Sequence, residues 1–419
     1  MAKTITGKQV GDSYYQVEHP SGLTVLLYPK EHCSTTYAIF GTRYGSIDNC
    51  FQRSDEAGPE SVPEGIAHYL EHKLFESEEG DAFERFSKTG ASANAFTSFE
   101  STCYLFSTTD QVYQSLEILL DFVQSPYFTE ETVRKEQGII GQEIKMYDDD
   151  PQWRGMFNYL KAMYRSHPIR EDIAGTVESI AKITPELLYR CYNTFYNLGN
   201  MVLAIAGNFQ VDKALAVCDK MLKPAAPVTV QRVFPQEPDT IVQPVVEERL
   251  SVASPLFQFG FKEPGADQPR SEKDVAATEV LLETLASDAS PLFRRLLDQG
   301  LVNESSFSYE YFEGNGYATV MFSGESKDPQ AVAQAILEEV ERFQREGIPA
   351  EAFERSKRAL YGELVAALNS TGLVNMHLKG RELFTYIDSL ASLRLEDGEE
   401  RLRKVFQRER SVLSVILPH

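Results

Sequence analysis

Residues 63–75 of the chain read PEGIAHYLEHKLF. Within them, His68 and His72 are four residues apart, and Glu71 follows the first histidine by three. On an amphipathic helix this spacing places both imidazoles on one face, with the carboxylate beside them. Zinc held by neutral imidazoles lowers the pKa of a bound water to about 7, and a nearby carboxylate can take that proton. Because His-x-x-Glu-His inverts the better-known His-Glu-x-x-His motif, the stretch indicates a zinc site with Glu71 as its base.

A catalytic site with two histidines needs a third protein ligand, and residues 128–144 offer two candidates. This segment is typical of a helix that begins after Thr129 as N-cap. Glu136 and Glu143 are seven residues apart, so they lie two turns apart on one face of that helix. The pattern leaves open which of them binds the metal. The alternative interpretation is an acidic face directed to solvent.

These two motifs together resemble the pitrilysin/insulinase zinc peptidases, specifically the two-domain branch that includes mitochondrial processing peptidase and its bacterial relatives. The resemblance implies that the zinc ligands are His68, His72 and Glu143. It also implies that Glu71 is the general base and that Glu136 is a supporting carboxylate in the second shell around the metal.

Two more stretches carry the resemblance, residues 90–97 and residues 174–200, so it covers most of residues 20–210. In the first of them, the family likeness makes Asn94-Ala95-Phe96 an edge strand that binds substrate. A peptide would add there as a further strand, main chain to main chain, with little sequence selectivity. The alternative is an ordinary edge strand protected by its flanking residues.

The pattern of apolar residues predicts an α+β fold, in which helices pack on one face of a mixed or antiparallel sheet. Residues 221–245 are rich in proline and lack periodicity, which is typical of a linker. The second half resembles a worn repeat of the first, because Phe293–Gly300 matches Phe83–Gly90 in spacing. We therefore predict two homologous domains, a zinc-bearing domain over residues 1–220 and one without a metal site over residues 246–419.

By this register, the three residues of the zinc motif fall opposite Thr278, Leu281 and Leu282. Members of the family that complete a site from the C-terminal half carry an Arg and a Tyr around a Gly-Leu-x-Tyr turn. This chain has Leu296 and Asn303 at those positions instead. Nearby residues that could replace the missing pair are Arg294, Arg295, Tyr309 and Tyr311.

Composition narrows the class of partner and the compartment. The formal net charge of −21 argues against nucleic acid and anionic membranes and favours cationic peptides, although solubility alone also explains an acidic surface. The chain has no run of 18 apolar residues and no apolar signal region at its start, so we expect no membrane insertion and no secretion. Five cysteines without paired spacing are typical of free thiols, which favours a cytoplasmic protein.

The motifs and the resemblance together predict a zinc metalloendopeptidase subunit that cleaves peptides or extended unfolded segments. Two alternatives stay open: a non-catalytic structural or assembly subunit of the same fold, and a maturation peptidase dedicated to one precursor peptide. Because the family builds its chamber from four such domains, we expect this chain to work as a dimer. A heterodimer with a homologous subunit that supplies the Arg and the Tyr is preferred, and a homodimer is the alternative.

Overall fold

The computed structural model describes residues 2–78, 80–368 and 381–419 of the chain. By packing, the chain forms two compact units. Unit 1 comprises Met1–Ile144, Glu171–Val233 and Val365–Phe384, and unit 2 comprises Lys145–Arg170, Phe234–Leu364 and Thr385–His419. These units differ from the predicted domain ranges, most clearly because residues 145–170 pack with unit 2. The boundaries of the domains therefore stay a prediction.

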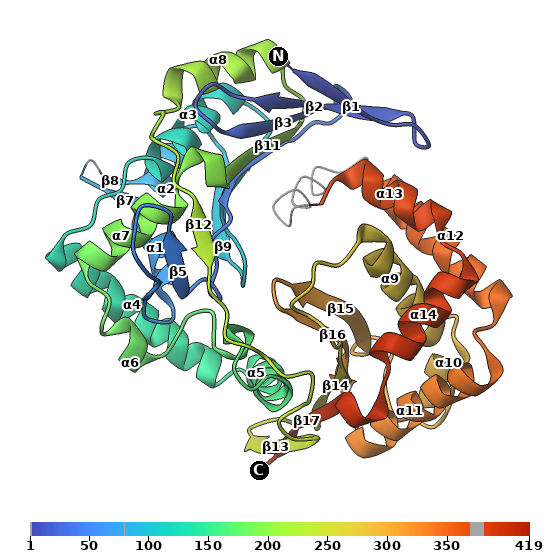
Figure 1. Cartoon of the computed structure of the whole chain (residues 1–419). Coiled ribbons are helices and arrows are strands. Elements are labelled where there is room, and N and C mark those ends of the chain that lie inside the picture. Colours follow the sequence, from blue (N-terminus) through green and yellow to red (C-terminus); the bar gives the residue numbers. More distant parts are fainter. Residues whose placement is uncertain (1, 79, 369–380) are drawn as a thin grey trace. The chain divides into compact units, whose positions relative to one another are not determined.

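Unit 1 is built on a seven-stranded sheet of order β1-β2-β3-β11-β4-β10-β9 (Figure 1). Its strands are β1 (Lys3–Gly7), β2 (Asp12–Glu18), β3 (Thr24–Pro29), β4 (Thr36–Thr42), β9 (Ser92–Thr97), β10 (Thr102–Thr108) and β11 (Met201–Gly207). Only β11 and β3 run parallel among these pairs, so the sheet is mixed. Every residue of β11 is buried, as expected of a central apolar strand.

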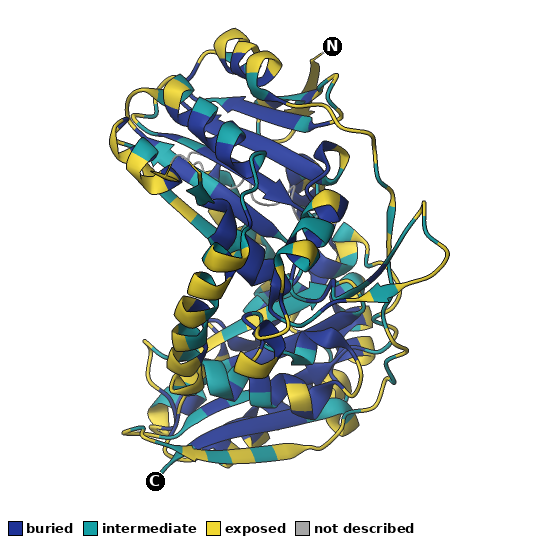
Figure 2. Cartoon of the chain, turned by 90° about the vertical axis from the view of Figure 1, so that its left-hand side faces the viewer, coloured by how far each residue is buried: buried dark blue, intermediate teal, exposed yellow. Residues whose placement is uncertain are grey.

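Helices cover one face of this sheet (Figure 1). They are α1 (Ile66–Leu74), α2 (Ala82–Ser87), α3 (Val112–Val123), α4 (Glu130–Asp148), α6 (Val177–Ile180), α7 (Pro185–Phe195) and α8 (Val211–Met221), with the 3-10 turn η2 (Leu198–Asn200). Short strands complete the unit: β5 (Cys50–Arg53), β6 (Glu60–Ser61), β7 (Glu76–Ser77), β8 (Gly80–Asp81) and β12 (Val230–Arg232). Buried residues gather on the strands, whereas exposed ones lie on loops and on the outer sides of helices (Figure 2).

Unit 2 has a five-stranded sheet of order β13-β17-β14-β16-β15. Its strands are β13 (Val245–Leu250), β14 (Leu256–Lys262), β15 (Ser308–Gly314), β16 (Tyr317–Glu325) and β17 (Ser411–Pro418). Its helices are α5 (Pro151–Met163), α9 (Glu272–Ala286), α10 (Pro291–Asp298), α11 (Pro329–Glu346), α12 (Ala350–Ala367), α13 (Leu383–Ser392) and α14 (Leu395–Val405), with the 3-10 turns η1 (Pro168–Arg170) and η4 (Arg408–Arg410). Three helices, α4, α12 and α13, cross the border between the units.

The two sheets share one topology. The strands β3-β11-β4-β10-β9 of unit 1 correspond in order to β13-β17-β14-β16-β15 of unit 2, and each series contains one parallel pair at the same place. The glycines after α2 and α10, Gly90 and Gly300, both have positive φ, at 73° and 58°, as the predicted register requires. The chain is thus an α+β protein with two homologous domains.

Helix α5 precedes unit 2's other described helices in sequence and packs with that unit. Helix α5 packs on the sheet, where Ser414 of β17 donates a hydrogen bond from Oγ to the carbonyl oxygen of Gly155 at 3.0 Å. Tyr159, two-thirds of the way along α5, contacts Thr319 on β16 at 2.6 Å between the two hydroxyl oxygens. Residues 151–163 follow α4 in sequence, yet they complete the core of unit 2.

Part of the predicted linker is ordered against unit 1. Val230–Arg232 forms β12, which pairs antiparallel with β5. Arg232 donates from Nε to the buried Asp48 at 2.7 Å.

Among the described residues, no helix combines the length and the apolarity that crossing a bilayer requires.

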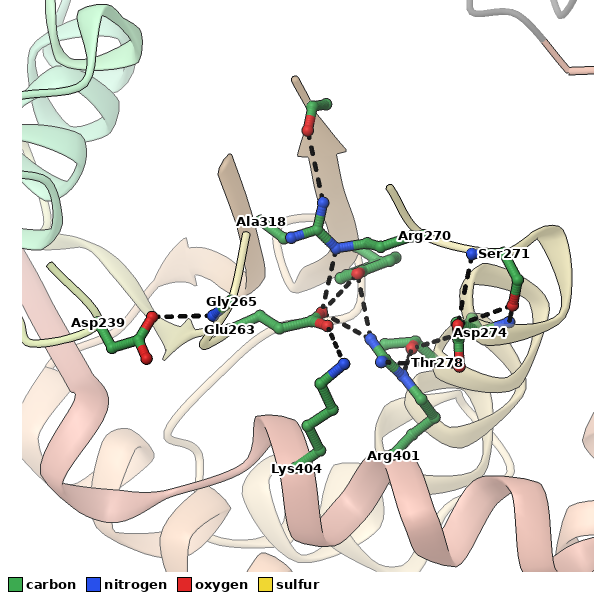
Figure 3. A network of polar contacts seen from close by, with 12 residues as sticks. Asp239, Glu263, Gly265, Arg270, Ser271, Asp274, Thr278, Ala318, Arg401 and Lys404 are labelled. Carbon is green, nitrogen blue, oxygen red and sulfur yellow. Dashed lines mark hydrogen bonds and ion pairs between the residues drawn. The ribbon is translucent and has the colours of Figure 1, made fainter. Parts of the chain in front are cut away.

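The place in unit 2 that corresponds to the metal motif holds a network of ion pairs around the buried Glu263, which contacts Arg401, Arg270 and Lys404 (Figure 3). Thr278 accepts a hydrogen bond at 2.7 Å from Nε of Arg401, which is 1% exposed. Arg401 also binds Glu263 at 2.6 Å, and that carboxylate is 1% exposed too. Leu281 and Leu282 lie in the core. The three positions that correspond to the zinc motif therefore take part in core packing and in the network around Arg401 and Glu263.

Candidate metal centre

Helix α1 begins at a site that admits only glycine. Gly65 precedes the helix with φ at 85°, and a Cβ atom there would lie 2.3 Å from the carbonyl oxygen of Ala174. A side chain would meet backbone at this distance, so the helix start depends on the missing Cβ. Ser179 ties the same corner by donating from Oγ to the carbonyl oxygen of Glu64 at 2.9 Å. The 174–200 stretch thus supports the start of the helix that carries both histidines.

Helix α4 is held against α1 by Tyr69, whose buried hydroxyl donates to the carbonyl oxygen of Val133. As predicted, Thr129 caps this helix, since its Oγ1 accepts from the N–H of Thr132 at 3.2 Å. Of the 19 residues of α4, only three apolar ones are buried: Val133, Ile140 and Ile144. This narrow stripe fixes the rotation of the helix and turns Glu136 and Glu143 towards α1.

Three side chains meet where these helices face each other. One possible ligand atom each from His68, His72 and Glu143 lies within 4.8 Å of the others. Nε2 of His68 is 3.6 Å from Oε1 of Glu143, and Nε2 of His72 is 3.3 Å from Oε2. On the other edge of its ring, His72 contacts Oε1 of Glu136 through Nδ1 at 3.0 Å. The structure thus brings the two helices' predicted residues into one cluster.

The cluster fits a zinc ion by its donor set and its spacing. Ligand atoms at about 2.0–2.1 Å from a tetrahedral zinc lie roughly 3.3 Å from one another. The contacts of 3.3 and 3.6 Å between imidazole nitrogens and the carboxylate match that separation. Two imidazoles and one carboxylate are a common protein ligand set for catalytic zinc with one position left open. The contact of Glu136 with Nδ1 of His72 would fix that ring with Nε2 turned to the metal.

The protonation of the two histidines differs strongly. Burial lowers the pKa of His68 to about 4, and the neighbouring His72 adds to this effect. Burial also disfavours the charged form of His72, but the hydrogen bonds that its ring donates to Glu136 and Glu143 outweigh this effect and raise its pKa to about 10. Zinc ligation needs both imidazoles neutral; burial favours that form at His68, whereas the two carboxylates favour the protonated form of His72.

Glu71 lies on α1 beside the cluster, and a residue of the sheet donates a hydrogen bond to its carboxylate. Oγ1 of Thr97, on β9, donates to Oε2 of Glu71 at 2.7 Å. Burial raises the pKa of this carboxyl above its ordinary value, an effect that the Thr97 hydrogen bond and His72 reduce. A half-buried carboxylate next to a metal cluster has the surroundings typical of a general base.

The predicted substrate strand, Asn94-Ala95-Phe96, lies in β9, the last strand in the order of the seven-stranded sheet. Burial alternates along β9, so Asn94 and Phe96 are exposed whereas Ala95 is half-buried. The N–H of Ala95 donates to Oδ1 of Asn94 at 2.9 Å, which covers one donor of this edge. In the described sheet β9 is thus an edge strand, and Thr97 connects it to Glu71.

Two of the residues considered as replacements for the missing Arg and Tyr, Arg295 and Tyr309, are engaged within unit 2. Leu296 itself is fully buried. Arg295 donates from Nη2 to the carbonyl oxygen of Ala335 at 3.1 Å. Tyr309 donates from its hydroxyl to Oε2 of Glu283 at 2.6 Å. Each would have to leave these partners before it could contact a substrate.

The sequence motifs did not predict a role for Thr97 in this centre. It closes the stretch at residues 90–97 that carries the family resemblance. The period of two in a strand places Thr97 on the same face as Ala95, which is a usable signal. The contact with Glu71 itself joins residues 26 positions apart, and no local pattern predicts it.

Two family models match the chain. One, described as insulinase (peptidase family M16), matches residues 60–177, which contain the whole cluster. The other, described as peptidase M16 inactive domain, matches residues 182–360.

Single relatives agree with these models. A protein of Bacillus subtilis (strain 168) described as the uncharacterized zinc protease YmfH is 38% identical over 428 residues, which cover 100% of both chains. The crystal structure of a putative M16-like peptidase from Alicyclobacillus acidocaldarius is similar with a TM-score of 0.91 at 35% identity, and the match covers 100% of this chain and 98% of that one. Pitrilysin is similar in fold, with a TM-score of 0.72 at 15% identity, and the match covers 100% of this chain and 46% of pitrilysin.

Proposed function

Because the chain belongs to the insulinase family of peptidases (family M16), we propose that it is a zinc-dependent endopeptidase subunit. Its substrates are peptides or extended unfolded segments. The observation that supports this most strongly is the meeting of His68, His72 and Glu143 at the spacing of zinc ligands, with Glu71 beside them. Names of relatives such as the zinc protease of Bacillus subtilis agree with a zinc peptidase.

The chemistry follows from the roles of the side chains. His68, His72 and Glu143 would hold the ion, and Glu136 would orient His72 through Nδ1. A zinc ion bound there would polarise the scissile carbonyl and make a water molecule more acidic. Glu71 takes one proton from the attacking water as its oxygen bonds to the carbonyl carbon. Glu71 then gives that proton to the amide nitrogen as the C–N bond breaks, and the second proton of the water passes from the new carboxyl group to the amine, which leaves a carboxylate and an ammonium group.

Substrate binding is assigned to β9. An extended peptide adds to this edge strand through main-chain hydrogen bonds, in which Asn94, Ala95 and Phe96 take part. The alternation of β9 places Thr97, and through it Glu71, on one face of the same strand. Peptide binding along the strand therefore brings a carbonyl group past the base. Such recognition reads the backbone, so it selects extended segments and little sequence.

The test measures zinc content and hydrolysis in the same preparation. Protein purified without chelator is analysed by inductively coupled plasma mass spectrometry and assayed on quenched, unstructured peptides. We expect about one zinc per chain and cleavage that a chelator abolishes. His72→Ala should lose both. Full zinc occupancy without cleavage of any peptide, even in the presence of a homologous subunit, would contradict the proposal and favour an assembly subunit.

We infer further that the active form is a dimer, preferably with a different subunit of the same fold. The chain matches 46% of the length of pitrilysin, so two such chains correspond to one pitrilysin-sized assembly. Leu296 and Asn303 stand where the family resemblance implies an Arg and a Tyr, and Asn303 is used by its own turn, since its Oδ1 accepts from the N–H of Ser306 at 2.8 Å. A homologous partner that carries the Arg and the Tyr would complete the site. A peptidase devoted to one precursor peptide is compatible with the same chemistry.

A further inference from the structure

Thr97 occupies a defined position on the strand assigned to the substrate. Along β9, residues Ala93, Ala95 and Thr97 are half-buried, whereas Ser92, Asn94 and Phe96 are exposed. Thr97 pairs with Thr102 of β10, and Thr102 is itself fully buried. The hydroxyl of Thr102 donates to the carbonyl oxygen of Tyr44 at 2.9 Å. The backbone that carries Thr97 is thus fixed by the sheet.

The side chain of Thr97 is aimed at the base. Its Oγ1 donates to Oε2 of Glu71 at 2.7 Å, a length typical of a hydrogen bond to a charged acceptor. Threonine is branched at Cβ, so few side-chain rotamers are open to it in a strand. A hydroxyl placed in this way restrains one carboxylate oxygen and leaves the other, Oε1, for a proton.

We propose that Thr97 is the positioning residue of Glu71 and that it joins the placement of the base to the strand on which the peptide is bound. This inference rests on the proposed function, in which β9 binds the substrate and Glu71 accepts the proton. Thr97 keeps its own proton throughout and does not touch the substrate. Its hydroxyl fixes the position of the Glu71 carboxylate relative to β9. The distance from that carboxylate to a peptide paired with β9 is therefore constant. A hydrogen bond that orients a functional side chain is often worth about 10- to 100-fold in activity, so loss of the contact between Thr97 and Glu71 should be measurable.

Three variants separate the hydroxyl from the fold. Thr97→Val keeps the shape and the branching of the side chain and removes the donor. Thr97→Ser keeps the donor and removes a methyl group. Thr102→Val is the matched control, because it removes a strand hydroxyl at the paired position whose hydrogen bond goes to Tyr44.

The kinetic arm uses zinc-loaded chain in the assembly in which the wild type is active. We expect Thr97→Val to lower kcat by about 10-fold or more with KM and zinc content unchanged, and Thr97→Ser to retain kcat within about threefold. Adding Thr97→Val to Glu71→Gln should cause no further loss. Equal losses in Thr97→Val and Thr97→Ser, or in Thr97→Val and Thr102→Val, would overturn the inference, because they would point to a general effect on the strand.

The spectroscopic arm needs no metal and no turnover. The carboxylate stretching band of Glu71 is assigned by infrared difference spectra between metal-free wild type and Glu71→Gln. Loss of the hydrogen bond should move this band in Thr97→Val and leave it in place in Thr97→Ser and Thr102→Val. An unmoved band in Thr97→Val overturns the inference whatever the activity. A band that moves in a protein without any peptidase activity supports the positioning of Glu71 and contradicts the proposed function alone.

Discussion

His72 and Glu136 are joined at 3.0 Å between Nδ1 and Oε1, on the edge of the imidazole opposite to Glu143. One histidine therefore contacts two carboxylates of one helix, each through a different ring nitrogen. Nε2 of His72 faces Glu143 at 3.3 Å, whereas Nδ1 faces Glu136. This arrangement separates the expected roles of the two glutamates: Glu143 binds the metal, and Glu136 orients the ring.

The first prediction concerns these two roles. Glu136→Gln should lower zinc affinity or activity by about 10- to 100-fold, because the ring of His72 loses its charged partner but keeps Nε2. Glu143→Ala should lose zinc altogether. Competition with a chromophoric chelator measures both affinities. Glu130→Gln removes the same charge from an exposed position of the same helix and should change nothing. Zinc affinity as low in Glu136→Gln as in Glu143→Ala would make Glu136 a ligand.

The second prediction concerns the buried ion pair of unit 2 (Figure 3). Glu263→Gln should lower the free energy of unfolding by about 3–5 kcal/mol, since it leaves the buried guanidinium groups of Arg401 and Arg270 without the carboxylate that both contact. Urea denaturation measures this loss. Glu117→Gln, which breaks the solvent-exposed pair with Lys220 at 2.8 Å, serves as control and should cost much less. The triple variant Glu263→Leu, Arg270→Met and Arg401→Met, which removes both buried cations with the carboxylate, should be more stable than Glu263→Gln, and the reverse order would contradict this prediction.

The third prediction is a pH dependence of stability that comes from His167. Its Nδ1 accepts from the N–H of Ile169 at 3.1 Å and its Nε2 contacts the carbonyl oxygen of Asn315 at 3.0 Å, so both nitrogens suit the neutral ring. Burial lowers the pKa of His167 to about 4, against the smaller opposing effects of Asn315 and Glu237. Between pH 4 and about 6.5 the unfolded chain binds a proton that the folded chain does not, so stability falls as the pH falls through this range.

Because of His167, the free energy of unfolding of the wild type should fall by about 2 kcal/mol between pH 7 and pH 5. The slope is about 1.4 kcal/mol per pH unit below the pKa of the unfolded chain. The measurement compares the free energy of unfolding of the wild type and His167→Gln at several pH values. The variant should be less stable at pH 7 and show a flatter dependence. His32→Gln, at an exposed histidine, is the control and should keep the slope of the wild type. Equal slopes for His167→Gln and the wild type would remove His167 as the cause.

The fourth prediction concerns the partner. The homogeneous, zinc-loaded chain should cleave peptides poorly, because removal of oxyanion donors commonly costs about a hundredfold or more in rate. A homologous subunit that carries the Arg and the Tyr should restore cleavage, and light scattering should then show a dimer of the two. Because Arg295 and Tyr309 are engaged with Ala335 and Glu283, Arg295→Ala and Tyr309→Phe should not change activity further. Strong activity of the homogeneous protein that either variant abolishes would establish a self-sufficient homodimer.

The sequence predicted this centre well where its chemistry is local. A spacing of four places His68 and His72 on one face in any helix, and Thr129 has the chemistry of an N-cap in any helix. The spacing of seven likewise turned Glu136 and Glu143 the same way. The choice between these two glutamates came from the family resemblance, and it stays a prediction, since His72 contacts both.

What the sequence did not predict depends on packing between distant segments. The contact of Thr97 with Glu71, the position of α5 on the sheet of unit 2, and the pair of Arg401 with Glu263 all join elements whose register no local pattern specifies. Arg401 and Glu263 are 138 residues apart, and charged side chains are expected at the surface unless a partner is known. Burial of this pair follows from the topology of the sheet, which single residues do not reveal.

The central claim is that Glu71 is the general base of a zinc peptidase, and one comparison tests it most directly. Zinc content, unfolding temperature and peptide turnover are measured side by side for the wild type, Glu71→Gln and the control Glu78→Gln, which changes an exposed acid shortly after the motif. An amide cannot accept the proton of the attacking water, so Glu71→Gln should keep full zinc and a wild-type unfolding temperature and lose turnover, whereas Glu78→Gln should match the wild type in all three. Turnover retained in Glu71→Gln at full zinc content would contradict the account.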